Sequence, residues 1–210
     1  EKFHPVWYEA KQEVNEEGIQ GMKSSKEKAD YFLYECGLLS ELKEYGAPHM
    51  IGSYRMDMMA WNDLDIDIEN DGMSLEKLYQ LTGFILEKFH PVWYEAKQEV
   101  NEEGKTVWFH GFETKISGEL WNFDLWFFDA KTIARAEAFC DETAGGISKQ
   151  EGGKEAVIRI KEELIARGLY SFGKYTSMDV YRAVLEQGIL TAEDFLNQYK
   201  GSKWKESVSV

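Results

Sequence analysis

The stretch from residue 92 to residue 128 constrains the fold more than any other part of the sequence. Three runs with many β-branched and aromatic residues follow one another there, Val92–Val100, Thr106–Ile116 and Glu119–Phe128. Short polar segments that contain glycine, at residues 101–104 and 117–118, separate them and are typical of tight turns. Because such short connections join antiparallel neighbours, the stretch predicts a three-stranded antiparallel sheet.

The residues before this sheet predict two further strands and two helices. Apolar residues recur at helical spacing over Lys26–Lys43, and a second helix with a start at Ser74 ends before Pro91. Ala47–Gly52 is short and apolar, which predicts a buried strand. Acidic and aliphatic residues alternate over Asp63–Glu69, which predicts a strand with one buried face.

After residue 130 the pattern becomes helical. Four helices are predicted, at Lys131–Glu142, Lys154–Gly168, Ser177–Gln187 and Thr191–Tyr199. Glycine pairs at 145–146 and 152–153 predict a flexible linker between the first two. Strands and helices are thus segregated, which is typical of an α+β fold, with one domain over residues 22–130, a C-terminal helical subdomain over 131–200 and a tail over 201–210.

One segment occurs twice. Residues 1–18 are identical to residues 87–104, and the copies diverge at the next position. One repeat is too few for a solenoid. We interpret residues 1–21 as a duplicated, non-native segment in front of a domain that starts near Met22. The alternative is a tandem element that exchanges between protomers, so a dimer or a segment swap is compatible with the sequence.

Composition excludes several classes of protein. The 210 residues carry a net charge of −14, which disfavours binding of bulk nucleic acid. Cys36 and Cys140 lie far apart without metal-ligand spacing, so we expect neither a disulfide framework nor a zinc site. A protein with so few cysteines is expected in the reducing cytoplasm. No apolar run is long enough to span a membrane, and no secretory signal is visible.

The residues that point to chemistry lie between Ile51 and Glu69. Gly52 and Ser53 follow a predicted strand, and nine residues separate Ser53 from Asp63. Asp63 and Asp65 lie two apart on the next strand, so their side chains leave the same face roughly 6.5–7 Å apart at Cα. Two such carboxylates favour a hard divalent cation, whereas glycine and a serine hydroxyl suit a phosphate.

This pattern resembles the nucleotidyltransferase superfamily with the DNA polymerase β-like fold. The residues that carry the resemblance are Gly52-Ser53 and the Asp63-Leu64-Asp65-Ile66 run, and the most similar group is the small bacterial aminoglycoside and lincosamide nucleotidyltransferases. The resemblance implies a mixed sheet flanked by helices and a third carboxylate on a later strand. Asp124, the single acid in Leu120–Phe128, fits that position.

The resemblance also implies roles for these residues. Asp63 and Asp65 would hold the Mg²⁺ or Mn²⁺ that carries the triphosphate of an NTP such as ATP. Together with Asp124 they would bind a second ion that activates an acceptor hydroxyl, and Asp124 would also accept its proton. Gly52 and Ser53 would seat the triphosphate.

Two assignments are left open by the residues themselves. Asp65 and Asp67 also fit the acidic pair; we prefer Asp63 and Asp65, with Asp67 orienting a ligand. Arg55 either reaches a phosphate or is a surface arginine. The alternative without a functional site is that the three acids form a solvated strand face. Three aligned carboxylates repel one another, however, and need a cation or nearby basic residues.

We therefore predict a metal-dependent nucleotidyltransferase that moves a nucleoside monophosphate from an NTP to a hydroxyl of a small molecule or a protein. One alternative is a non-catalytic, nucleotidyltransferase-like binding module, such as the antitoxin-like member of a toxin–antitoxin pair. Another is a metal-dependent phosphodiesterase that uses the same acids with water as the nucleophile.

Overall fold

The computed structural model describes residues 22–199 except 23, 71, 102 and 172. The duplicated segment 1–18 and the predicted tail therefore lie outside the described residues. The described chain forms two compact units, one of residues 22–54 and 62–137, the other of residues 55–61 and 138–199. The predicted boundary between residues 130 and 131 stays a prediction.

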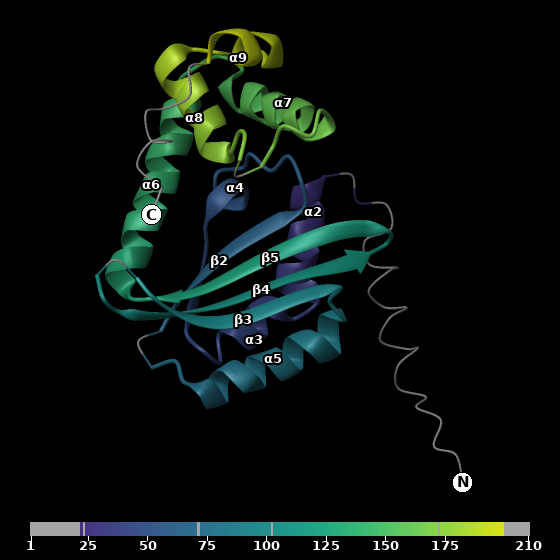
Figure 1. The fold of residues 1–210 in the computed structure, drawn as a ribbon, viewed down its shortest axis with the longest axis vertical. Coiled ribbons are helices and arrows are strands. Elements are labelled where there is room, and N and C mark those ends of the chain that lie inside the picture. Colours follow the sequence, from purple (N-terminus) through teal and green to yellow (C-terminus); the bar gives the residue numbers. More distant parts are fainter. Residues whose placement is uncertain (1–21, 23, 71, 102, 172, 200–210) are drawn as a thin grey trace. The chain divides into compact units, whose positions relative to one another are not determined.

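A mixed five-stranded sheet forms the first unit (Figure 1). Its strands are β1 (Ala47–Met50), β2 (Asp63–Glu69), β3 (Trp93–Val100), β4 (Thr106–Ile116) and β5 (Glu119–Phe128). The order across the sheet is β1-β2-β5-β4-β3, in which β2 and β5 run parallel and the other neighbours antiparallel. The predicted mixed sheet is thus confirmed, including the antiparallel arrangement of the last three strands.

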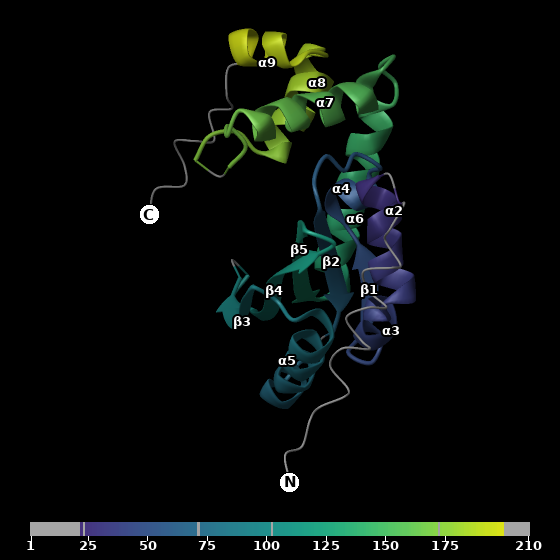
Figure 2. The ribbon, with the colours of Figure 1, turned by 90° about the vertical axis from the view of Figure 1, so that its right-hand side faces the viewer.

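Helices cover one face of this sheet, as Figure 2 shows from the side. They are α2 (Ser25–Asp30), the π-helical segment η1 (Tyr31–Glu35), α3 (Leu38–Leu42) and α5 (Leu75–Phe89). Phe32 of η1 and Phe89 of α5 both pack their rings against Phe123 of β5, at 5.6 and 5.8 Å between ring centroids. Because neighbouring residues of a strand point to opposite faces, Asp124 leaves the other face of the sheet.

Two expectations about this unit are wrong. A single helix over Lys26–Lys43 is not formed, because Gly37 adopts a left-handed conformation with φ +82° and separates η1 from α3. β1 is not a buried strand but the edge of the sheet, with Ala47 exposed and Pro48 within it. Proline lacks the N–H that a central strand would have to donate, so an edge position suits it.

The second unit is helical. It contains the C-terminal part of α6 (Ala130–Ile147), together with α7 (Gly153–Ala166), α8 (Ser177–Gln187) and α9 (Ala192–Gln198). The predicted linker is shorter than expected, since α6 continues through Gly145 and Gly146 to Ile147 and only residues 148–152 separate it from α7. A Cβ at Gly146 would lie 2.6 Å from Cδ2 of Leu185, so this glycine lets α6 and α8 approach. None of the described helices is long and apolar enough to cross a membrane.

Candidate metal centre

Three aspartates converge on the face of the sheet opposite α5. Asp65 of β2 lies directly beside Asp124 of β5 in the parallel ladder, and Asp63 lies beside Asn122. Asp63, Asp65 and Asp124 are half-buried, and each offers a carboxylate oxygen within 4.8 Å of the others. The parallel pairing therefore brings together three acids that are up to 61 positions apart in the sequence, within the distance that shared metal ligation requires.

Gly52 lies directly against this acidic cluster. It opens the short helix α4 (Gly52–Arg55) with φ +61°, and a Cβ built on it would lie 2.1 Å from Oδ2 of Asp65. The preceding residue, Ile51, donates its backbone N–H to the carbonyl oxygen of Asp65 at 3.1 Å. Ser53 follows and is buried at 7% exposure. Only glycine combines this backbone conformation with so close an approach to a carboxylate.

Asn122 supports the cluster, although no motif in the sequence pointed to it. Its side-chain amide donates to Oδ1 of Asp63 at 2.8 Å. Burial raises the pKa of Asp124, and a hydrogen bond from Asn122 opposes that rise. The only sequence signal for this role is its place two residues before Asp124, on the same face of β5.

Asp67 belongs to a different group of side chains. It is 7% exposed and pairs across the β1–β2 ladder with His49, whose Nδ1 lies 3.1 Å from Oε1 of Glu137 in α6. Burial, and then the charge of Asp65, raise the pKa of Asp67 to about 7, while His49 opposes the rise. Asp67 is not among the acids whose oxygens converge, so the geometry favours Asp63 and Asp65 as the pair.

Arg55 has a carboxylate partner of its own. It belongs to the second unit, where Nε and Nη2 each donate to Asp141 at 2.9 Å. This two-pronged ion pair fixes the planar guanidinium group.

The donor set fits a hard divalent cation. Carboxylate oxygens are the ligands that Mg²⁺ and Mn²⁺ prefer, and three of them within 4.8 Å match a shared site. Burial raises the pKa of Asp67 and of Asp124, so negative charge is poorly solvated in this region. A bound cation would offset that charge.

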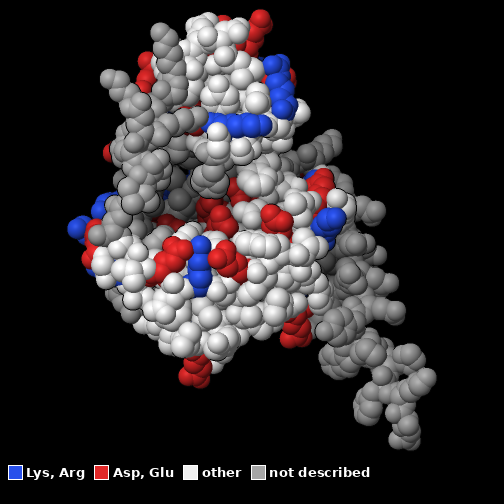
Figure 3. Space-filling view, in the orientation of Figure 1, with Lys and Arg blue, Asp and Glu red and all other residues white. Residues whose placement is uncertain are grey.

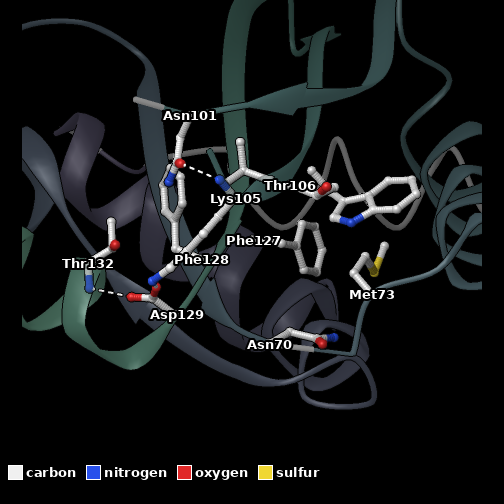
Figure 4. Close-up of a pocket in the computed structure, with 11 residues that line it drawn as sticks. Asn70, Met73, Asn101, Lys105, Thr106, Phe127, Phe128, Asp129 and Thr132 are labelled. Carbon is white, nitrogen blue, oxygen red and sulfur yellow. Dashed lines mark hydrogen bonds and ion pairs between the residues drawn. The ribbon is translucent and has the colours of Figure 1, made fainter. Parts of the chain in front are cut away.

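A pocket of about 570 Å³ lies at the opposite end of the sheet (Figure 4). It is lined by Asn70, Met73, Asn101, Lys105, Thr106, Val107, Trp108, Phe127, Phe128, Asp129 and Thr132. Phe128 lies four residues along β5 from Asp124, roughly 13 Å away. The ion pair between Lys105 and Asp129 crosses the polar side of the pocket, as Figure 4 shows. This pocket is therefore separate from the acidic cluster.

Comparison with known proteins supports the fold. No protein-family model matches the sequence, and curated protein sequences show no significant match. Among solved structures, the Cid1 poly(U) polymerase with Mg and 3′-dATP bound is similar with a TM-score of 0.52 and 16% identity. The non-canonical poly(A) polymerase complex GLD-2–GLD-3 is similar with a TM-score of 0.51 and 12% identity.

These similarities cover most of this chain but only part of the polymerases. The matches include 85% and 94% of this chain, and 55% and 66% of the poly(U) and poly(A) polymerase chains. Identities this low speak for the fold and not for the reaction. The mixed sheet with its helices is a nucleotidyltransferase-type α+β fold.

Proposed function

We propose that this protein is a metal-dependent nucleotidyltransferase that transfers a nucleoside monophosphate from an NTP to an acceptor hydroxyl. The observation that carries the proposal is the convergence of Asp63, Asp65 and Asp124 beside the backbone of Gly52. The two polymerases of similar fold act on nucleotides, as their names state, and one was solved with Mg and a nucleotide. The closer likeness to aminoglycoside and lincosamide enzymes and a cytoplasmic location belong to the same proposal.

The residues divide the work as follows. Asp63, Asp65 and Asp124 would hold Mg²⁺ or Mn²⁺, which supplies positive charge to the phosphates and lowers the pKa of an acceptor hydroxyl. Asp124 would also accept the hydroxyl proton. Gly52 leaves room for phosphate oxygens at the backbone, and Ser53 offers a hydroxyl donor. Arg55, the proposed phosphate contact, is paired with Asp141 through Nε and Nη2.

The acceptor is proposed to be a small molecule or a protein. The two polymerases of similar fold are named for poly(U) and poly(A). In this chain, the sheet face that carries Asp124 also carries Glu95, Glu99 and Glu113, with Lys97 among them. Figure 3 shows acidic side chains gathered over these strands. A polyanion would be repelled by this face, whereas a neutral or small acceptor would not.

A product screen tests the proposal. The protein is incubated with each labelled NTP, Mg²⁺ or Mn²⁺ and panels of hydroxylated small molecules, proteins and RNA, and pyrophosphate and labelled acceptor are measured. Wild type should release pyrophosphate with one acceptor, and Asp124→Asn should lose at least 100-fold in rate, the usual effect of removing such a base. Glu76→Gln, which removes the same charge from the exposed side of α5, should keep the rate.

The alternatives give other outcomes. A labelled nucleotide released without a labelled acceptor would indicate the phosphodiesterase. Binding of metal and NTP without turnover would indicate a non-catalytic module.

A further inference from the structure

β3 presents a long free edge. It is the last strand in the sheet order, pairs with β4 on one side and has no described strand on the other. Apolar side chains stand exposed at both ends of this edge, with Val92 at 60% and Val100 at 71%. An eight-residue edge of this kind offers its backbone groups to another strand.

An apolar stripe on α5 runs beside that edge. Positions 75, 79, 82 and 86 lie on one side of the helix, and Leu75, Tyr79 and Leu86 are exposed at 58%, 68% and 46%. The fourth residue, Thr82, bonds through its hydroxyl to the Tyr94 hydroxyl of β3 at 2.6 Å. The stripe therefore borders β3, and Figure 1 shows α5 next to that strand. The edge and the stripe therefore lie side by side and form one surface, apolar on the helix and at both ends of the strand.

We propose that this surface binds a second copy of the chain, with β3 pairing antiparallel to β3 of the partner around a two-fold axis at Ala96. The two sheets would join into one, and the two α5 stripes would meet beneath it. The proposal is independent of the proposed function, because no residue of the acidic cluster takes part.

The sequence of the strand favours the register centred on Ala96 over the two adjacent ones. In an antiparallel ladder, opposed residues belong to the same hydrogen-bonding class, and the classes alternate along a strand. Two copies of one strand therefore pair only with a residue, not a peptide bond, at the two-fold axis. Centring on Glu95 or on Lys97 places identical charges opposite each other at the axis, which is unfavourable.

Centring on Ala96 gives a complementary set of pairs. Lys97 then faces the partner's Glu95, and this ion pair forms twice. Val92 faces the partner's Val100, so the most exposed apolar side chains of the edge cover each other. Lys97 lies between two glutamates of its own strand, at 3.6 Å from Glu95 and 2.7 Å from Glu99. The strand therefore carries two carboxylates for one ammonium group, and one carboxylate can pair with the partner's Lys97.

The duplicated segment is the rival occupant. Residues 1–18 repeat residues 87–104, so they contain the same eight-residue sequence as β3. If that segment pairs with the edge instead of a partner, the full chain stays monomeric. The experiments below separate the two outcomes.

Cross-linking tests the axis. Cα atoms of directly opposed residues lie about 4.5–5.5 Å apart, within the range that a disulfide spans. Full-length Ala96→Cys should therefore form a disulfide-linked dimer on mild oxidation, while the native Cys36 and Cys140 are buried. Gln80→Cys, exposed on the outer side of α5, is the control. Equal cross-linking of both variants, or none at Ala96→Cys, would overturn the proposal.

Charge reversal tests the register. By sedimentation, the full wild-type chain should dimerise with a dissociation constant on the order of 1–100 µM, as small interfaces do. Lys97→Glu should weaken dimerisation about tenfold or more, because two glutamates then face each other across the axis. The double variant Glu95→Lys/Lys97→Glu should restore dimerisation, because residues that face each other again carry charges of opposite sign. A wild-type chain that is monomeric at about 1 mM, or a double variant no better than Lys97→Glu, would contradict the proposal.

Discussion

At the scale of single residues, Gly52 has a tightly restricted position. A side chain is excluded there by the positive φ of +61° and by a carboxylate oxygen of Asp65, which a Cβ at this position would overlap. Gly52→Ala should lower stability by more than the roughly 1 kcal/mol that a left-handed alanine costs, and should displace Asp65. Gly37 is a matched control, with φ +82° and nothing within 4 Å of its Cβ position. Thermal unfolding with and without Mn²⁺ should show a lost metal response in Gly52→Ala and a retained one in Gly37→Ala.

Asp67 should make the stability of the metal-free protein depend on pH. Its pKa in the folded state is about 7, against 3.8 in a model peptide. Between these values the folded state keeps a proton that the unfolded chain has released, so the contribution is present below pH 4 and is lost as pH rises through 7. In EDTA, Asp67→Asn should remove this decline, worth up to roughly 4 kcal/mol. Denaturant unfolding at pH 5 and at pH 8 measures the decline in free energy of unfolding. An equal decline in wild type and in Asp67→Asn would refute the assignment.

At the scale of elements, a partly buried chain of polar side chains joins α5, β3 and β4. The Thr82 and Tyr94 hydroxyls lie 2.6 Å apart, and Tyr94 Oη lies 2.8 Å from Nδ1 of His110. Burial lowers the pKa of His110 from 6.5 to about 4, so the folded state holds it neutral. Its contribution to stability is present above pH 6.5 and is lost as pH falls towards 4.

The variant His110→Phe isolates this effect. Phenylalanine does not titrate, and Tyr94 keeps its bond to Thr82. Between pH 7 and pH 5 wild type should lose about 2 kcal/mol more than His110→Phe in free energy of unfolding. Urea titrations at the two pH values give the difference, and equal losses would show that His110 is not the titrating group.

The two glycines inside α6 should respond differently to alanine. Gly145 has nothing within 4 Å of its Cβ position, so Gly145→Ala should stabilise the protein by about 0.5–1 kcal/mol through helix propensity. Gly146→Ala should gain less or destabilise, because the new methyl meets Leu185 at 2.6 Å. Melting temperatures of both variants test this packing; an equal gain in both would contradict it.

For the whole molecule, metal binding should appear as a gain in stability. A ligand that binds only the folded state adds about 2.7 kcal/mol at a hundredfold excess over its dissociation constant, or roughly 5–10 °C for a chain of this size. Mg²⁺ or Mn²⁺ should therefore raise the melting temperature, and an NTP should raise it further.

Matched aspartate variants identify the ligands. Asp65→Asn should abolish most of the metal response and, without metal, should be as stable as wild type or slightly more so, because one repelling charge is gone. Asp67→Asn should change the response less. A larger loss in Asp67→Asn than in Asp63→Asn would move the ligand pair to Asp65 and Asp67.

Much of the fold could be predicted from local patterns. The strict alternation over Asp63–Glu69 and the glycine turn at residues 117–118 are local signals, and the strands formed there. The π-helical turn before Gly37 and the edge position of β1 could not be predicted in this way. The π-helical turn and the edge position depend on which other elements pack against each segment, and the periodicity of a sequence carries no information about those contacts.

The sequence by itself determined which side chains share a face of each strand, because the strand period of two is a property of the backbone. The alternation alone therefore places Asp63, Asp65 and Asp67 on one face of the strand. Only the tertiary structure decided that β5 lies parallel to β2, with Asp124 beside Asp65 and Asn122 beside Asp63. The pairing of strands distant in sequence depends on burying a whole face of the sheet, such as the face that carries the fully buried Phe123. No local sequence pattern encodes that burial.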